Sequence, residues 1–138
     1  MRVILDTNLL ISALITEGNS PYLLVQAWLE GRFELISSEA QLDEMTRVNR
    51  YPQVRKYIES AEAGWLINQL RNRARMVNKI PTVDGSRDPG DNFLLGMAQA
   101  SKADYLATGD KRDVLSIGRW AGTRIVTASQ LVKVLKLP

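Results

Sequence analysis

The sequence predicts an α/β fold in which a parallel sheet is covered by helices on both faces. Short apolar runs of strand length alternate along the chain with segments of helical pattern. Strands that alternate with helices are joined by right-handed crossovers, so they lie parallel in one sheet. The 138 residues, 45% hydrophobic and 24% charged, are typical of one globular domain spanning residues 1–138.

The first half of the chain is expected to hold two strands and three helices, over residues 3–5, 8–15, 20–30, 33–36 and about 38–48. The strands are short apolar runs. Ser20 is the predicted N-cap of the second helix, because Pro21 then takes the first helical position. That helix ends before Gly31, where a left-handed cap is favourable. Either Ser37 or Ser38 caps the third helix.

The second half is expected to be helical over residues 49–80, with a short helix from Pro52 and then a longer one. The longer helix carries apolar residues near helical spacing: Ile58, Ala61, Trp65, Leu70, Ala74 and Val77. Residues 81–90, rich in Pro and Gly, form a loop. The remaining elements are a helix over 91–101, strands over 105–108 and 124–126, a short helix near 114–117 and a last helix to residue 137. Thr127 and Gln130 form the capping box of that last helix.

The sequence contains neither Cys nor His. This excludes disulfides, thiolate nucleophiles, Ser-His-Asp triads and Cys or His zinc sites, and leaves carboxylates, hydroxyls, amides, Lys, Arg and oxygen-liganded metals. The longest uncharged stretch is the 12 residues 18–29, whereas a membrane span needs about 20 apolar residues. No apolar core precedes a cleavage site near Met1, so we expect no signal peptide and a cytoplasmic protein.

Two acids follow predicted strands. Asp6 comes directly after the first strand, and Asp110 follows the strand over 105–108 after Gly109. In open parallel sheets, sites form beyond the carboxyl ends of the strands, where the strand order switches. The alternative role for Asp110 is that of a turn residue. Asp6 is harder to explain structurally, because a carboxylate beside a buried strand is costly unless it is paired, hydrogen-bonded or metal-bound.

Two further acids lie on predicted helices. Asp91 begins a helix, and taken alone it is better explained as an N-cap worth about 1 kcal/mol. Glu44 lies on the helix after the second strand, where a solvated face is the alternative. Spacing alone does not distinguish Glu44 from Asp43 or Glu39 on the same helix.

Four carboxylates that converge in one cleft repel each other and therefore attract a cation. Because no His or Cys is present, the donors are hard oxygens, which favour Mg²⁺, Mn²⁺ or Ca²⁺. Mg²⁺ keeps several waters and usually engages substrate phosphates. The acids therefore indicate phosphate-ester chemistry, in which one or two metal ions activate water and stabilise the leaving oxygen.

Four segments of the chain resemble the acidic motifs of PIN-domain proteins in order and spacing. They are ILDTNLLISAL at 4–14, EMTRV at 44–48, DPGDNFLLGMA at 88–98 and ADYLATGDK at 103–111. Each motif alone is weak, but four in order, each preceded by the expected element, form a specific pattern. The resemblance covers nearly the whole chain, from Arg2 to about Leu135.

The resemblance implies a three-layer α/β/α fold and a divalent-metal-dependent endoribonuclease that uses Mg²⁺ or Mn²⁺. It carries catalytic and metal-binding roles onto Asp6, Glu44, Asp91 and Asp110, and supporting hydrogen-bonding roles onto Asn8 and Thr108. It thereby selects Glu44 over Asp43. The subgroup that the chain most resembles is the toxin component of bacterial toxin–antitoxin pairs, which implies an antitoxin partner and a homodimer.

The last motif departs from the family pattern. Many relatives read Thr-Gly-Asp-Lys-Asp, whereas this chain has Arg112 before Asp113. Asp113 is therefore either a further metal ligand or the cap of the short helix that follows, and the cap is slightly favoured. Asp88 is interpreted as a loop residue before Pro89 and not as a ligand.

The segment from residue 47 to 79 is strongly basic. It holds eight basic residues, namely Arg47, Arg50, Arg55, Lys56, Arg71, Arg73, Arg75 and Lys79, and two acids, so it carries +6 while the rest of the chain carries −3. An acidic active site needs a basic approach surface to hold a polyanion, so we interpret these residues as RNA-binding. A solvated helix face and a patch for an acidic protein partner are the alternatives. Trp65 is expected in the core.

Two other functions are weaker. A haloacid-dehalogenase-like phosphatase also begins with a strand and Asp, but it needs Asp-x-Asp, and Asn8 replaces the second acid. A PIN-like RNA- or protein-binding module without catalysis is the non-enzymatic alternative. Four clustered negative charges argue against it, because they would not help a protein to bind RNA.

Overall fold

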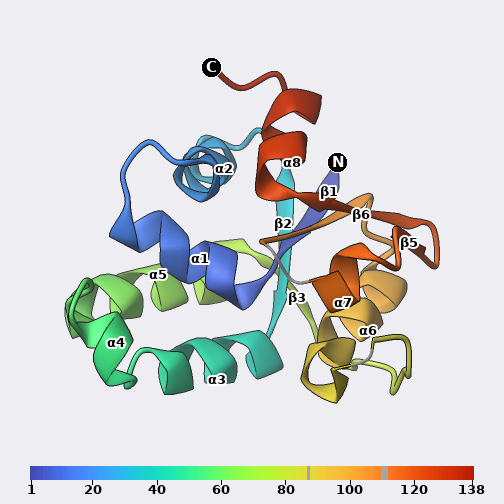
Figure 1. Ribbon diagram of the computed structural model, residues 1–138, viewed down its shortest axis with the longest axis horizontal. Coiled ribbons are helices and arrows are strands. Elements are labelled where there is room, and N and C mark those ends of the chain that lie inside the picture. Colours follow the sequence, from blue (N-terminus) through green and yellow to red (C-terminus); the bar gives the residue numbers. More distant parts are fainter. Residues whose placement is uncertain (87, 110–111) are drawn as a thin grey trace.

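A computed structural model describes residues 1–86, 88–109 and 112–138 (Figure 1). In these ranges the strands are β1 (Arg2–Leu5), β2 (Glu34–Ser38), β3 (Arg75–Val77), β4 (Tyr105–Thr108), β5 (Arg119–Trp120) and β6 (Thr123–Thr127). The helices are α1 (Thr7–Ile15), α2 (Ser20–Leu29), α3 (Glu39–Val48), α4 (Pro52–Arg55), α5 (Ser60–Arg73), α6 (Asn92–Ser101), α7 (Arg112–Leu115) and α8 (Ala128–Val134), and a 3₁₀ turn spans Pro89–Asp91. None of these helices is long and apolar enough to cross a membrane.

The strands form one sheet in the order β3-β2-β1-β4-β6-β5. All neighbouring pairs are parallel except β5 with β6. The predicted α/β fold with a parallel sheet is confirmed, with an antiparallel edge at β5. In this order β1 and β4 lie side by side at the point where the strand order switches, so their carboxyl ends form the place where such folds hold a site.

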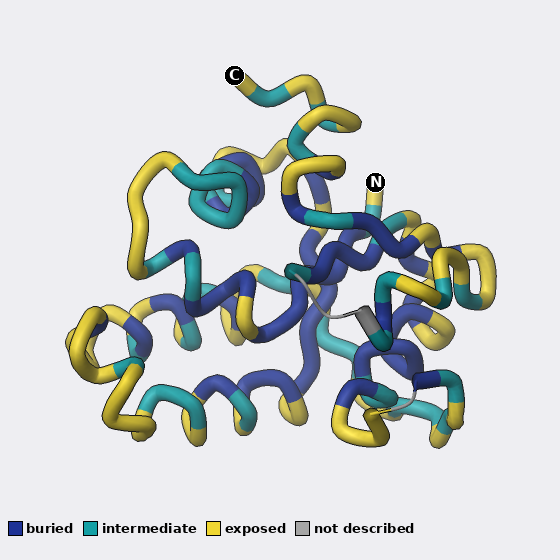
Figure 2. Tube along the Cα trace, in the orientation of Figure 1, coloured by how far each residue is buried: buried dark blue, intermediate teal, exposed yellow. Residues whose placement is uncertain are grey.

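Alternate strand residues separate the core into two layers. Val3 and Leu5 of β1 pack with α1, α2, α3, α5 and α8, whereas Ile4 packs with α6 and α7 on the opposite face. The central strands are dark blue along their length in Figure 2, because helices cover the sheet on both sides. This confirms the three-layer α/β/α architecture.

Helix boundaries agree with the sequence except at a few caps and at two C-terminal elements: α7 spans Arg112–Leu115 and not residues near 114–117, and α8 ends at Val134 and not at residue 137. Asn19, and not Ser20, caps α2, since its side chain accepts a hydrogen bond from the Tyr22 N–H. Ser38 caps α3. Gly31 has a φ of 81°, as expected of the residue that follows α2. The capping box of α8 is present.

The prediction that residues 49–80 are helical throughout is wrong at its end. Helix α5 stops at Arg73, and Arg75–Val77 form β3, which pairs with β2 at the edge of the sheet. Two of the residues assigned to the helix, Ala74 and Val77, therefore lie beyond it. A three-residue strand is too short to display a period of its own, so the helical spacing of the apolar residues before it was extended too far.

Candidate functional site

Asp6 is the best-defined part of the site. It lies directly beyond β1 as the N-cap of α1, and its side chain is fully buried. One carboxylate oxygen accepts a hydrogen bond from the Leu9 N–H at 2.9 Å. The other accepts from the Thr108 hydroxyl and from the Gly109 N–H, the latter at 3.4 Å. These donors from α1 and the end of β4 hold the carboxylate at the switch in strand order.

The Thr108 hydroxyl donates directly to Asp6, and the supporting role that the family resemblance gives Thr108 stays a prediction. Asn8 is exposed in the first turn of α1, two residues after Asp6. Thr7, between Asp6 and Asn8, has a buried hydroxyl without a hydrogen-bond partner among the described residues. The site thus presents one more oxygen donor beside Asp6 than sequence reasoning identified.

A buried glutamine orients α3 toward the same end of the sheet, a role that sequence reasoning missed. The Gln41 amide donates to the Leu5 carbonyl at the end of β1 at 2.8 Å and accepts from the Ser37 hydroxyl at 2.6 Å. Glu44 is three residues further along α3 and so lies on the same face of the helix. No sequence signal separated Gln41 from the other polar residues of this mostly polar helix.

Glu44 and Asp43 differ in their surroundings. Asp43 is exposed, whereas the Glu44 side chain is 23% exposed and pairs with Arg47 at 3.7 Å. Glu44 is the more buried of the two acids, and its selection as a site residue from the family resemblance stays a prediction. Because Arg47 itself is mostly exposed, it can contact an anion that reaches Glu44.

Asp91 lies at the junction of the 3₁₀ turn and α6, with 7% of its surface exposed. Asp91 occupies the N-cap position of α6, as the sequence allowed, but its side chain makes no capping hydrogen bond to that helix. Asp88 instead accepts from the Gly90 N–H at 2.9 Å and stabilises the turn, consistent with a loop residue. Asp91 is therefore a buried carboxylate at the amino end of α6.

The fourth acid, Asp110, lies outside the described residues. Asp113 is in the first turn of α7, which begins at Arg112, so the expectation that Asp113 caps a helix starting near residue 114 is wrong. Within residues 1–86, 88–109 and 112–138, no three acids lie close enough together to hold a metal ion. The donor chemistry nevertheless fits a hard cation, because carboxylates and the buried Thr7 hydroxyl are oxygen donors.

The eight basic residues assigned to RNA binding are all exposed and fall into two groups along the chain. Arg47, Arg50, Arg55 and Lys56 lie on or near α3 and α4, whereas Arg71, Arg73, Arg75 and Lys79 lie at the end of α5 and around β3. Helix α5 has 14 residues and separates the two groups by about 20 Å.

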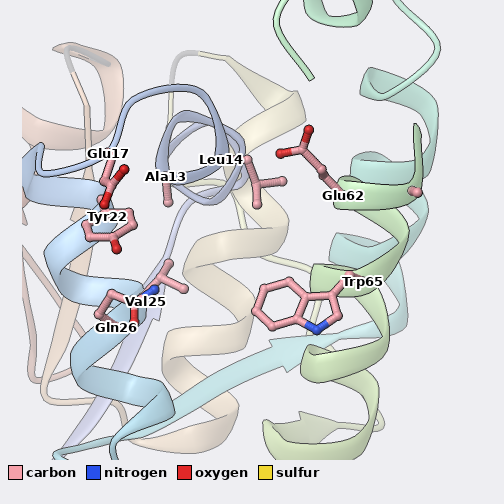
Figure 3. Close-up of a pocket in the computed structure, with 9 residues that line it drawn as sticks. Ala13, Leu14, Glu17, Tyr22, Val25, Gln26, Glu62 and Trp65 are labelled. Atoms are coloured by element: carbon pink, nitrogen blue, oxygen red, sulfur yellow. The ribbon is translucent and has the colours of Figure 1, made fainter. Parts of the chain in front are cut away.

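The prediction that Trp65 belongs to the core is wrong: the residue is 48% exposed. Its ring forms one wall of a groove of about 590 Å³, opposite Tyr22 and Val25 of α2 (Figure 3). Leu14 of α1 also lines the groove, and the acids Glu17 and Glu62 lie at its sides. The described lining contains no basic residue, so this groove does not attract the RNA backbone.

The geometry defines an α/β/α protein with a buried carboxylate at the switch point of a parallel sheet. The chain belongs to the PIN domain family, whose model matches residues 2–112. Members of this family are generally nucleases.

Two comparisons identify proteins to which the chain is similar. It is 28% identical over 118 residues to an uncharacterised protein of Methanocaldococcus jannaschii, a match that covers 85% of this chain and 75% of the relative. It is similar in fold to VapBC2 from Rickettsia felis, solved bound to a DNA fragment from the promoter. That match has a TM-score of 0.57 and 16% identity, and covers 91% of this chain and 97% of the other.

Proposed function

We propose that the chain, as a single domain of residues 1–138, is a divalent-metal-dependent endoribonuclease that hydrolyses RNA phosphodiester bonds. The observation that carries the proposal is the fully buried Asp6 carboxylate, held by donors from α1 and β4 at the switch point of the sheet. Burying a carboxylate costs free energy. A carboxylate that is nevertheless buried at the position where such sheets hold a site is a candidate functional group. Membership of a nuclease family supports the same conclusion.

In this proposal Asp6, Glu44, Asp91 and Asp110 hold Mg²⁺ or Mn²⁺, with Asp113 as a further candidate ligand. The bound ion would supply an activated water and a stabilised leaving oxygen. Leu9, Thr108 and Gly109 fix the orientation of Asp6 through their hydrogen bonds. Asn8 is a supporting polar group, and the exposed basic residues beside α3 guide the RNA backbone toward the acids.

The test uses a mixed RNA pool incubated with the purified chain and Mg²⁺ or Mn²⁺, followed by sequencing of the product ends. We expect cleavage that a chelator abolishes and that Glu44→Gln loses. Asp43→Asn, one residue away on the exposed side of α3, is the matched control and should cleave like the wild type. Cleavage with chelator present refutes the metal-dependent mechanism, and binding without cleavage identifies a non-catalytic module.

We also infer that the nuclease is the toxin of a toxin–antitoxin pair, acts in the cytoplasm and forms a homodimer. The Trp65 groove supports a protein partner, because its apolar walls and acidic sides fit an aliphatic side chain next to a Lys or Arg. We expect Trp65→Ala to weaken binding of the cognate antitoxin in calorimetric titration and to leave RNA cleavage unchanged. Sedimentation tests the dimer.

A further inference from the structure

A second groove, on the face of β3 that packs against α6, is strongly basic. It has a volume of about 450 Å³ and is formed by residues from β3, the end of α6 and the start of β1. Four of its lining residues are cationic: Arg2, Arg75, Lys79 and Lys102. The neighbouring Glu34 carboxylate offsets one of these four charges, so the walls retain a local excess of positive charge.

The two arginines of this groove are held in place. The Glu34 carboxylate lies between them, 3.7 Å from Arg2 Nε and 3.1 Å from Arg75 Nη1. Arg2 also donates from Nη1 to the Ser101 carbonyl at 2.9 Å. About a third of the Arg2 side chain and half of the Arg75 side chain remain exposed. Both guanidinium groups are therefore oriented while N–H donors stay accessible to an anion.

Lys102 adopts a backbone conformation that lysine rarely adopts. It ends α6 with a φ of 54°, in the left-handed region where Gly or Asn is usual. Glycine would adopt this backbone conformation without strain, so Lys102→Gly can remove the charge without destabilising the fold. A cation near the carboxyl end of a helix also interacts favourably with the helix dipole. That effect does not depend on the lysine lining a groove.

We propose that this groove is a second phosphate-binding site for single-stranded RNA, separate from the acidic end of the sheet. The inference rests on the proposed ribonuclease function and extends it. Asp91 and Lys102 lie at opposite ends of α6, whose 10 residues separate them by about 15 Å. An RNA strand held at the acids therefore reaches the groove only when it is long enough to run along α6 and β3.

The positive charges also favour RNA over a second copy of the chain as the partner that binds at this edge of the sheet. β3 is an edge strand, and a second copy of the chain is the other partner that such an edge could bind. Two copies would bring Arg75 and Lys79 against identical charges, which opposes pairing. A polyanion gains from the same charges through release of its counterions.

The test compares two lysines of the same conformation. Lys136, just after α8, also has a left-handed backbone, with a φ of 56°, and lies on the helix layer opposite α6. Lys102→Gly and Lys136→Gly remove the same charge and relieve the same strain. Both should fold at least as stably as the wild type in thermal unfolding.

RNA binding is measured by fluorescence anisotropy in Mg²⁺ as a function of salt, with one short and one long single-stranded RNA, and every protein also carries Glu44→Gln to block cleavage. We expect Lys102→Gly to weaken binding of the long RNA severalfold and to lower its salt slope by about 0.7, with a smaller effect on the short RNA. Lys136→Gly should match the wild type. Adding Lys79→Gln to Lys102→Gly should double the loss of slope.

Equal affinities and slopes for the two glycine variants would overturn the proposal, as would an equal loss on both RNA lengths. A change of oligomeric state in Lys102→Gly would identify the edge as an interface between copies instead. Because binding is measured in a variant that does not cleave, the groove is tested independently of catalysis. Absence of cleavage with intact length-dependent binding would refute the catalytic proposal alone.

Discussion

Gly96 of α6 is a point where the fold has no room for a side chain. A Cβ at this position would lie 2.6 Å from the Ile80 side chain and 2.6 Å from the Pro81 carbonyl oxygen. Ordinary contact begins near 3.4 Å, so the backbone at Pro81 would have to move by about 0.8 Å. We expect overpacking to cost Gly96→Ala about 2 kcal/mol, partly offset by the helix preference of Ala, about 1 kcal/mol.

Gly64 is a closely matched control. Like Gly96 it is the fifth residue of its helix, but a Cβ there meets nothing within 4 Å. Gly64→Ala should therefore raise the free energy of unfolding by about 1 kcal/mol, and Gly96→Ala should lower it by about 1 kcal/mol. The gain from the helix preference of Ala is the same in both variants, so the difference between their free energies of unfolding gives the packing cost at Gly96. Chemical denaturation measures both values, and equal stabilities for the two variants would refute the close approach of α6 to Pro81.

The acidic site leads to two further predictions. Asp6→Asn should keep the cap of α1, because Asn is as effective an N-cap as Asp. Its amide nitrogen cannot accept from the Gly109 N–H, so we expect the free energy of unfolding to fall by about 1 kcal/mol while RNA cleavage is lost; a much larger drop would attribute the loss to unfolding. Millimolar Mg²⁺ or Mn²⁺ should raise the melting temperature by binding the folded state only. Asp91→Asn should raise the melting temperature measured without metal, because it relieves carboxylate repulsion, and it should reduce the increase that the metal ion produces. Scanning fluorimetry with and without chelator measures this, and an unchanged wild-type curve would argue against a preformed site.

Central strands of the fold were predictable from local sequence. β4 has the bounds expected for it, because an apolar run between a polar residue and Gly109 marks both ends. β1 also lies where Asp6 interrupts an apolar run. β3 and β5 were not predictable, since strands of three and two residues at the sheet edges are fixed by their neighbours and not by a pattern of their own.

The position of Asp6 was predictable because a strand end in a parallel sheet is defined by the same local pattern. Its surroundings were not. Thr108 and Gly109 are more than 100 residues away in sequence, and Gln41 reaches the Leu5 carbonyl across 36 residues. Such contacts depend on the order of strands in the sheet, which periodicity does not specify. The exposure of Trp65 likewise depends on how α5 lies against α2.

Arg71 and Arg73 show why the basic residues of α5 have to be tested separately. The Arg73 guanidinium lies 5.7 Å from the centre of the Trp28 ring and donates to the Leu29 carbonyl at 2.8 Å. These contacts attach the end of α5 to the end of α2. Arg71 pairs only with the exposed Glu39, at 3.5 Å, among the described residues.

Arg73→Gln should therefore lower the free energy of unfolding by about 1–2 kcal/mol, from the lost ring contact and hydrogen bond. Arg71→Gln should change it by less than about 0.5 kcal/mol, because an exposed ion pair contributes little. If both arginines contact RNA, both variants weaken binding, but only the loss in Arg71→Gln reports on RNA without a contribution from the fold. Equal stability of the two variants in urea denaturation would show that the Arg73 side chain does not link α5 to α2. Arg73 would then be a solvated basic residue like Arg71.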